Sequence, residues 1–235
     1  MRTYIDEEAL MKLIQRQGYL DFLRRNRNRP IVKVVSGIRR CGKSTLFRLF
    51  KDELLSEGVK PEQIISINFE ELEYEHLREY HALYQYILER MQPDEMNYIF
   101  LDEIQHVDQF HRVVDSLFVK ENTALYITGS NAYFMSSDIA TLLTGRYVEI
   151  QMLPLSFSEF YHSKYDGNQY SLIPAYESYL RESSFPYTQQ LGGEDFDIQE
   201  YLRGLYNTLL LHDVVARLKI SDVTILQDIV RLYLI

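Results

Sequence analysis

The fold is set by residues 31–45, which read IVKVVSGIRRCGKST. They open with a short β-branched run between a proline and a glycine, which predicts a buried strand. The stretch from Gly37 to Ser44 then matches the pattern G-x-x-x-x-G-K-[ST] in full. Apolar residues follow at the spacing of one helix face, from Leu46 to Leu54. A strand, a glycine-containing loop and a helix in this order predict a phosphate-binding loop, or P-loop.

Each part of this loop has a chemical role. Gly37 and Gly42 have no Cβ, so the backbone can approach phosphate oxygens closely. Backbone N–H groups and the start of the following helix supply hydrogen-bond donors and a positive dipole. Lys43 is expected to reach the β- and γ-phosphates, and the Ser44 hydroxyl to bind Mg²⁺ directly. The nucleotide-binding residues that we expect are Gly37, Ile38, Arg39, Arg40, Cys41, Gly42, Lys43, Ser44 and Thr45.

Residues 98–103, YIFLDE, supply the acidic half of such a site. They predict a buried strand that ends in two carboxylates. Asp102 is expected to hold Mg²⁺ through water, and Glu103 to polarise the attacking water. The adjacent glutamate favours water over a substrate hydroxyl as the phosphoryl acceptor. It is typical of hydrolases with an extra strand between the P-loop strand and the acidic strand. No Asn/Thr-Lys-x-Asp element for guanine is present, so ATP is the preferred nucleotide.

Two further positions are catalytic candidates. Ser130 and Asn131 follow a predicted strand and can sense the γ-phosphate, although a helix N-cap is an equally open role for them. Arg146 stands just before the last predicted strand. It can stabilise transition-state charge in its own chain or in a neighbouring copy. The alternative is a surface arginine that pairs with Glu149 or Asp138.

Strands and helices alternate through the first 150 residues. Beyond the P-loop unit we expect strands at 64–69, 98–101, 125–127 and 147–150, and helices at 6–26, 76–91, 107–118 and 132–143. The connections are too long for hairpins, so the sheet is expected to be parallel and covered on both faces. The predicted fold class is α/β, a P-loop NTPase three-layer sandwich with strand order 5-1-4-3-2, followed by a helical segment.

The chain is expected to form two parts. Residues 1–155 are predicted to be an ATPase domain with an N-terminal helix. Residues 156–235 are mostly helical by pattern, with turn signals near 166–168 and 191–193. Because the helical spacing continues to the last residue without a cap, we expect this segment to be the start of a truncated C-terminal domain.

Charge is unevenly distributed along the chain, whose net charge is −9. Residues 1–50 hold 12 lysines and arginines but only 4 acidic residues. This imbalance favours a polyanion near the start of the chain, and the acidic remainder argues against a protein that coats nucleic acid. The basic run at 24–29 is either a nucleic-acid patch or a solvated helix C-terminus, where cations complement the dipole.

Composition also bears on the compartment. The single cysteine, Cys41, allows no internal disulfide. No apolar stretch approaches the roughly 18–20 residues that span a bilayer, and the first residues lack the apolar core of a secretory signal. We therefore expect a cytoplasmic protein that does not enter the membrane.

Five stretches together resemble a prokaryotic AAA-type P-loop ATPase family, whose members carry an ATPase domain followed by a C-terminal domain of unknown function. These stretches are VVSGIRRCGKSTLF, YIFLDEIQHV, YITGSNAYFMS, LLTGRYVEI and MLPLSFSEFY. The resemblance is dense over residues 15–165 and continues around 201–215. It implies ATP binding and hydrolysis, with Gly37, Gly42, Lys43 and Ser44 at the phosphates and Asp102 and Glu103 in the acidic motif. It also implies Ser130 in the sensor position and Arg146 in the arginine position.

The sequence therefore predicts a Mg²⁺-dependent ATP hydrolase that works as a conformational switch or motor. One alternative is a nucleotide-gated module with little turnover that docks DNA or a protein partner. Another is a kinase that transfers the γ-phosphate to a small molecule. The partner, and association with further copies of the chain, stay open at this point.

Overall fold

The structure, a computed structural model, describes residues 14–130, 143, 145–165, 170–191, 195–209, 215 and 223–233. The chain divides into two compact units, Met1–Gly167 and Asn168–Ile235. The first unit holds the P-loop and the acidic motif, together with helix α7, Phe157–Tyr165. The assignment of residues 156–235 to the start of a larger domain stays a prediction.

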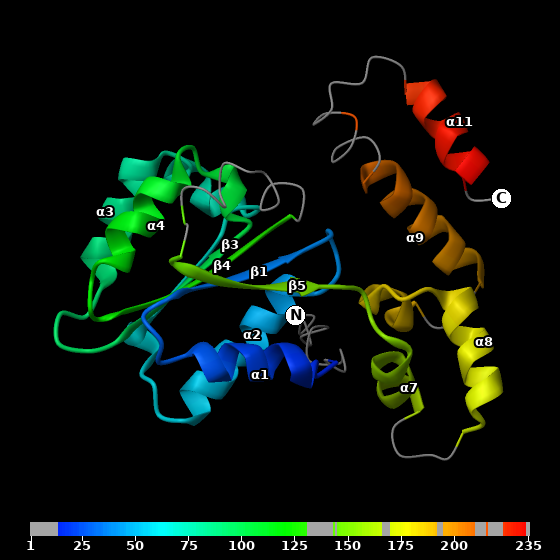
Figure 1. Cartoon of the computed structure of the whole chain (residues 1–235), viewed down its shortest axis with the longest axis horizontal. Coiled ribbons are helices and arrows are strands. Elements are labelled where there is room, and N and C mark those ends of the chain that lie inside the picture. Colours follow the sequence, from blue (N-terminus) through cyan, green and yellow to red (C-terminus); the bar gives the residue numbers. More distant parts are fainter. Residues whose placement is uncertain are drawn as a thin grey trace, which may run out of the picture. The chain divides into compact units, whose positions relative to one another are not determined.

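The first unit is built on a five-stranded parallel sheet (Figure 1). Its order is β2-β3-β4-β1-β5, which read from the other edge is 5-1-4-3-2, so the predicted order is confirmed. The strands are β1 Val32–Gly37, β2 Ile64–Asn68, β3 Asn97–Asp102, β4 Thr123–Ser130 and β5 Tyr147–Met152. Because all strands run the same way, their carboxyl ends share one edge of the sheet. At this edge Gly37 lies beside Ser130 and Met152, and Asn68 lies beside Asp102.

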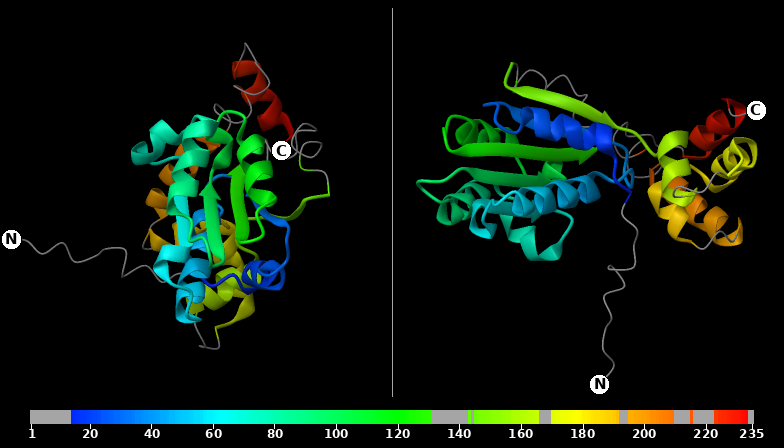
Figure 2. Two further views of the ribbon diagram at one scale, coloured as in Figure 1. Left: turned by 90° about the vertical axis from the view of Figure 1, so that its left-hand side faces the viewer. Right: turned by 90° about the horizontal axis from the view of Figure 1, so that it is seen from below.

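Helices cover both faces of the sheet (Figures 1 and 2). On one face lie α1 Gln17–Asn26 and α2 Lys43–Ser56, and on the other α3 Tyr80–Arg90 and α4 Phe110–Phe118. A hydrophobic core lies on each face of the sheet, and strand β1 contributes to both. Val32 and Val34 belong to the core under α3 and α4, and Val35 belongs to the core under α1 and α2. A strand buried on both faces is typically an apolar run without alternation. Residues 31–35 follow this pattern except at Lys33. Short 3₁₀ helices fill connections at Pro61–Gln63 (η2), Leu72–Leu77 (η3) and Ile104–His106 (η4).

Three predicted helices differ in extent from the observed ones, and a fourth is almost wholly undescribed. The helix predicted at 107–118 is observed as α4, which begins at Phe110. The segment predicted at 76–91 begins earlier as η3 and continues as α3. Of the helix predicted at 6–26, the structure describes only the part from residue 14, where α1 starts at Gln17. The helix predicted at 132–143 lies outside the described residues except for Leu143, which is buried.

An aromatic cluster holds α2 against the sheet. The rings of Phe100 and Tyr126 stack with centroids 4.6 Å apart, and Phe47 meets Phe100 edge-on at 5.2 Å. Phe50 packs against the same two rings from the next turn of α2. Buried aromatic pairs of this kind add specific geometry to their large buried area. They fix α2 so that its first residue, Lys43, starts at the carboxyl edge of β1.

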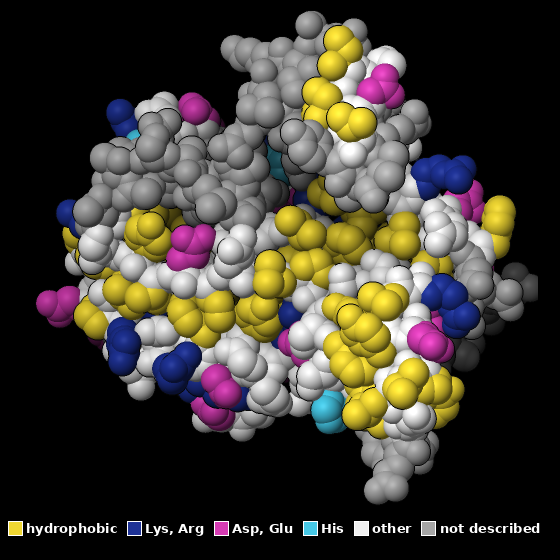
Figure 3. Space-filling model, turned by 45° about the vertical axis from the view of Figure 1, so that its right-hand side comes forward, with side chains coloured by type: hydrophobic (Ala, Val, Ile, Leu, Met, Phe, Trp, Pro, Cys, Tyr) yellow, Lys and Arg dark blue, Asp and Glu magenta, His cyan; other side chains and the backbone are white. Residues whose placement is uncertain are grey.

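The second unit is helical in its described part. It contains α8 Leu172–Glu182, η5 Pro186–Gln190, α9 Asp195–Thr208 and α11 Val223–Tyr233. Two helices expose apolar stripes at helical spacing (Figure 3), namely Ile173, Tyr176 and Leu180 on α8 and Ile225, Ile229 and Leu232 on α11. Exposed apolar surface of this extent is typical of interaction sites.

Lys33 is a charged residue inside the α1/α2 core. Its side chain is fully buried, and its Nζ donates to the carbonyl oxygens of Arg27 and Arg29 at 3.4 and 3.0 Å. The ammonium also lies 5.2 Å from the ring centre of Tyr126. Burial lowers the pKa of Lys33 to about 8. The unfolded chain therefore binds one proton more than the folded chain between pH 8 and the ordinary lysine value of 10.5.

This proton linkage predicts a pH-dependent effect of Lys33→Met. Because the folded pKa is depressed, the stability of the wild type should rise as pH increases through this window, by about 3 kcal/mol. Lys33→Met removes the titrating group, so any stability advantage of the variant at pH 7 should shrink by about that amount at pH 10.5. Urea unfolding of both proteins at the two pH values measures it, with the exposed Lys164→Met as a control. A parallel pH dependence of wild type and Lys33→Met would refute the prediction.

Candidate nucleotide site

The P-loop runs from the end of β1 to the start of α2 at the carboxyl edge of the sheet. Two residues in it, Arg40 and Gly42, adopt positive φ angles of 62° and 105°. Left-handed residues at such spacing turn backbone N–H groups toward one side and form an anion-binding concavity. Gly37 has a steric reason to be glycine, because a Cβ there would lie 2.3 Å from the carbonyl oxygen of Met152 on β5. The loop is therefore packed directly against the end of the edge strand.

Lys43 is buried at the centre of this site. Its Nζ donates to the carbonyl oxygens of Gly37 and Ile38 at 3.2 and 3.3 Å. It also forms an ion pair with Glu103, with Nζ and Oε1 3.0 Å apart, and both side chains are less than a tenth exposed. The structure thus brings together the lysine of the loop and the glutamate of the acidic motif, which are 60 positions apart in the sequence.

The two carboxylates of the acidic motif have different surroundings. Asp102 accepts a hydrogen bond from the Thr128 hydroxyl and lies near the Ser44 hydroxyl, and burial raises its pKa although both hydroxyls act to lower it. For Glu103, burial acts to raise the pKa, but the Lys43 ammonium and the Gln105 amide outweigh it and hold the pKa below its usual range. Glu103 is therefore held as a carboxylate. Its backbone is left-handed, with φ of 54°, which is unfavourable for a residue with a side chain and occurs mostly where function requires it.

Thr128, near the end of β4, is a site residue that sequence reasoning missed. Its buried hydroxyl donates to Asp102 Oδ1 and accepts the backbone N–H of Glu103 at 2.9 Å. One hydroxyl therefore fixes both acidic residues. The sequence pattern at the end of this strand predicts Ser130 and Asn131 as the residues that sense the γ-phosphate, and it does not distinguish Thr128.

Thr128→Val is expected to reduce ATP turnover about tenfold, because it leaves the buried N–H of Glu103 and one oxygen of Asp102 without this partner. Valine has nearly the shape of threonine, so the core should keep its packing. Thr128→Ser keeps the hydroxyl and should retain most of the activity. Steady-state phosphate release compares the three proteins, and an unchanged rate in Thr128→Val would show that this hydroxyl does not position the acidic motif.

Ser130 and Asn131 are only partly placed. Ser130 is the last residue of β4, and its backbone lies beside that of Gly37. The side chain of Ser130, and Asn131 as a whole, lie outside what the structure describes. The sensor role of Ser130 stays a prediction.

Arg146 does not lie at the P-loop of its own chain. It precedes β5 at the amino edge of the sheet, where its carbonyl accepts the N–H of Val32. Its guanidinium pairs with Asp115 at 2.8 Å and lies 5.7 Å from the ring centre of Phe118. Glu149, one of its predicted surface partners, instead accepts the Ser36 hydroxyl. With nearly half of its side chain exposed, Arg146 is available to a neighbouring copy, and that role stays a prediction.

Arg16 is the second site residue that the sequence did not reveal. Although charged, it is 4% exposed. Its guanidinium donates to the carbonyl oxygen of Cys41 in the P-loop at 3.2 Å, and to those of Leu153 and Pro154 after β5 at 2.6 and 3.2 Å. It also binds both carboxylate oxygens of Glu159 on α7, at 2.8 and 2.9 Å. One buried arginine thus connects the P-loop, the exit of β5 and α7.

Two arginines of the basic run at 24–29 are paired with acids of the same chain. Arg24 pairs with Glu53 and Asp21, and Arg27 with Glu57. This favours the interpretation of the basic run as a helix C-terminus over a nucleic-acid patch. In the P-loop, Arg39 lies 3.4 Å from Glu70. The Cys41 thiol is fully buried and burial raises its pKa, so it lacks the acidity of a reactive thiol.

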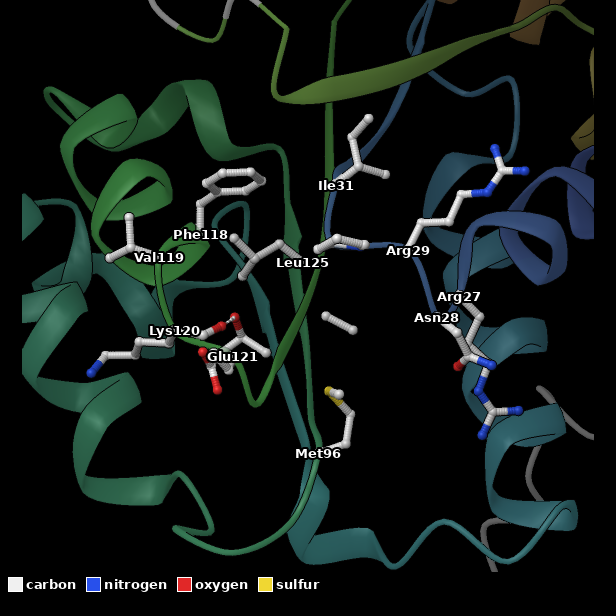
Figure 4. Close-up of a pocket in the computed structure, with 13 residues that line it drawn as sticks. Arg27, Asn28, Arg29, Ile31, Met96, Phe118, Val119, Lys120, Glu121 and Leu125 are labelled. Atoms are coloured by element: carbon white, nitrogen blue, oxygen red, sulfur yellow. Dashed lines mark hydrogen bonds between the residues drawn. The ribbon is translucent and has the colours of Figure 1, made fainter.

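A hollow of about 190 Å³ lies at the amino edge of the sheet, away from the P-loop (Figure 4). Its walls include the apolar side chains of Ile31, Phe118 and Leu125, with Arg29 and Lys120 around them. None of the residues predicted to bind nucleotide or metal lines it. The predicted nucleotide- and metal-binding residues therefore lie away from this hollow, at the carboxyl edge.

The residues present fit ATP with Mg²⁺. The loop offers a concave backbone, and the Ser44 hydroxyl lies near the Asp102 carboxylate. Among the described residues, no group of three or more histidines, cysteines, aspartates and glutamates could hold a metal. Mg²⁺ usually takes one or two carboxylates, with substrate phosphates and water completing its shell. The donor set here suits an ion that arrives with a nucleotide.

Comparison with known proteins gives three relevant similarities. The profile of a family described as AAA domain matches residues 29–161. An uncharacterized protein of Haemophilus influenzae is 37% identical over 221 residues, covering 93% of this chain and 54% of that protein. An uncharacterized protein of Methanocaldococcus jannaschii, MJ1544, is 30% identical over 208 residues, covering 82% of this chain and 44% of that protein. The chain thus spans about half the length of these relatives.

Among solved structures, the Walker-type ATPase PABY2304 of Pyrococcus abyssi has the same fold. It superposes with a TM-score of 0.59 at 15% identity, covering 88% of this chain and 76% of that one. In the described part of this chain, no helix is both long and apolar enough to cross a membrane.

Proposed function

Because the chain belongs to the AAA domain family of P-loop ATPases, we propose that it hydrolyses ATP with Mg²⁺ and acts as a conformational switch or motor. ATP is proposed to bind along residues 37–45 at the start of α2, where backbone donors and Lys43 face the phosphates. Glu103 is proposed to orient and polarise the attacking water. The ion pair between Lys43 and Glu103 is the observation that carries the catalytic part.

This ion pair gives the site a natural order of events. Lys43 now interacts with Glu103 and with two loop carbonyls. A γ-phosphate, with more negative charge than a carboxylate, is a stronger partner for the lysine. When Lys43 moves to the phosphate, Glu103 loses its cation and becomes available as a base. ATP binding would therefore activate the residue that hydrolysis needs.

Ser44 and Asp102 would hold the magnesium ion, with Thr128 fixing the aspartate. The ion would neutralise charge on the β- and γ-phosphate oxygens. Burial raises the pKa of Asp102, so a cation at its oxygens would stabilise the ionised form there.

The switch part of the proposal rests on Arg16. Its hydrogen bond to Cys41 attaches it to the P-loop, and its bonds to Leu153, Pro154 and Glu159 attach it to the segment that leaves the sheet. Glu159 in turn accepts the Ser156 N–H at 2.8 Å, which fixes the start of α7. A shift of the P-loop on nucleotide binding would be transmitted through this guanidinium to α7.

Steady-state phosphate release with Mg²⁺, with and without a chelator, tests the hydrolase directly. Turnover that disappears on metal removal supports it. ATP binding without turnover would favour the alternative, a nucleotide-gated module that docks DNA or a protein. Adding DNA to the same assay separates these partners, because stimulation would identify nucleic acid. Association of copies, in which Arg146 reaches a neighbour, is tested by sedimentation with and without a slowly hydrolysed ATP analogue.

Arg16→Gln is expected to uncouple α7 from the nucleotide. In the wild type, ATP analogue should change the hydrogen exchange of backbone amides in residues 153–165, whereas in the variant the change should fall by at least half. The variant removes charge-assisted hydrogen bonds, each worth about 1.5–3 kcal/mol, so thermal melting must confirm that the protein is folded at the assay temperature. Glu159→Gln keeps the shape of the contact with α7, and it should reduce the nucleotide-dependent change in exchange by a smaller amount.

The matched control is Arg24→Gln, which removes an exposed arginine of α1, the helix that follows Arg16, and this arginine also pairs with acids. It should leave the nucleotide-dependent exchange of residues 153–165 unchanged. If Arg16→Gln responds to the analogue as the wild type does, Arg16 has only a structural role. The proposal that it couples the P-loop to α7 would then be refuted.

A further inference from the structure

A polar groove of about 440 Å³ adjoins the predicted magnesium position. It lies on the α2 side of the sheet, between α2 and the edge strand β2, and Ser44 and Asp102 form one end of it. Ser66 and Asn68 line it from β2, and Glu71 and Tyr74 from the following loop and η3. Its volume is in the range of small-molecule sites.

Two cations of α2 line the groove, Arg48 and Lys51. They are three positions apart, so they project from the same helix face. Lys51 donates to the Ser66 hydroxyl at 2.8 Å. Arg48 makes no hydrogen bond or ion pair with the described residues, and its Nε is shielded from solvent without an acceptor. A shielded donor without an acceptor is unfavourable, and an anionic ligand would relieve it.

Among the described residues, no acid of the groove forms an ion pair with Arg48. Glu71 and Asp102 do act electrostatically on Lys51. Glu71 accepts the side-chain amide of Asn68 at 3.0 Å. Asp102 accepts the Thr128 hydroxyl. Both carboxylates are thus hydrogen-bonded to neutral donors. With a divalent cation at Asp102, the groove would carry an excess of positive charge.

We propose that this groove binds a phosphate group that does not belong to the nucleotide held by the P-loop. The proposal rests on the proposed function, because the groove opens at the place where ATP and Mg²⁺ are expected. A guanidinium fork and an ammonium suit the several oxygens of a phosphate. The group is either the inorganic phosphate released by hydrolysis or the phosphate of a second small ligand.

Calorimetric titration of the whole chain saturated with Mg²⁺ and ADP tests this proposal. Inorganic phosphate and glycerol 3-phosphate are titrated separately into wild type, Arg48→Gln and Lys51→Gln. We expect at least one of the two to bind the wild type, and each substitution to weaken that binding about tenfold or more. Arg90→Gln, which changes a cation on α3, is the matched control and should bind as the wild type does.

The two probes distinguish the source of the phosphate. Binding of inorganic phosphate alone identifies the hydrolysis product, and binding of glycerol 3-phosphate as well identifies a second ligand. Phosphate binding that is unchanged in Arg48→Gln and Lys51→Gln would place the anion in the P-loop and overturn the proposal, as would no binding of either probe. The affinity for ADP is measured first in each protein, so that failure of the groove proposal can be told from failure of the proposed function. A wild type that does not bind ADP would refute the nucleotide site itself.

Discussion

Glu103→Gln is expected to lower ATP turnover by roughly 10²–10⁴-fold while ATP binding is retained. Glutamine has the size of glutamate and can still accept the Gln105 amide that now donates to Glu103 at 2.5 Å. It cannot take a proton from water, and it carries no charge to polarise one. The substitution therefore removes the chemistry without removing the contact. Steady-state phosphate release gives the turnover, and calorimetry with a slowly hydrolysed analogue gives the affinity.

The ATP affinity of Glu103→Gln tests the proposed competition for Lys43. In the proposed mechanism Glu103 competes with the γ-phosphate for Lys43, because the two side chains form an ion pair at 3.0 Å. Without that competition, the variant is expected to bind ATP at least as tightly as the wild type. Glu89→Gln, which changes a largely exposed glutamate of α3, should alter neither turnover nor affinity. Unchanged turnover in Glu103→Gln would remove Glu103 from the role of base.

The strand order could be predicted because two short motifs fix it. The P-loop identifies β1, and the Asp102–Glu103 dipeptide identifies β3 and implies a strand between them, which the structure shows as β4. Apolar runs then supply β2 and β5 at the edges. These signals are local and chemically constrained, so a single sequence contains them.

Arg16 and Thr128 could not be found in this way. Arg16 and its partner Glu159 are 143 positions apart, and no local pattern distinguishes Arg16 from the other arginines of that region. Thr128 is one of several small polar residues after an apolar run, and its role depends on the distance between β3 and β4. The role proposed for each depends on tertiary contacts with elements that are far away in the sequence.

The position of Arg146 follows from strand direction. A residue that precedes a strand of a parallel sheet lies at the amino edge, whereas the P-loop follows β1 at the carboxyl edge. The sequence motif alone left both an internal and a neighbouring nucleotide open. The observed pair with Asp115 leaves Arg146 away from the P-loop of its own chain.

Lys43→Ala is expected to weaken ATP binding by about 10²-fold or more, since truncating one partner of a buried charged contact costs about 2–5 kcal/mol. Lys43 is the loop cation proposed to bind the phosphates, and it is 4% exposed, so water replaces it poorly. Calorimetry with ATP and Mg²⁺ measures the change. Micromolar affinity retained in the variant would contradict the assignment of the P-loop.

The substitution also leaves a buried carboxylate alone, and this second effect must be separated from the first. Lys43 lowers the pKa of Glu103, so without it burial should raise that pKa and destabilise the charged form. Breaking a buried ion pair from one side costs about 3–5 kcal/mol of folding stability. The double variant Lys43→Ala, Glu103→Gln removes the lone charge and should regain stability in thermal melting. Its ATP affinity should stay as low as that of Lys43→Ala, because the phosphates still lack their cation, whereas recovered affinity would show that Lys43 acts through folding alone.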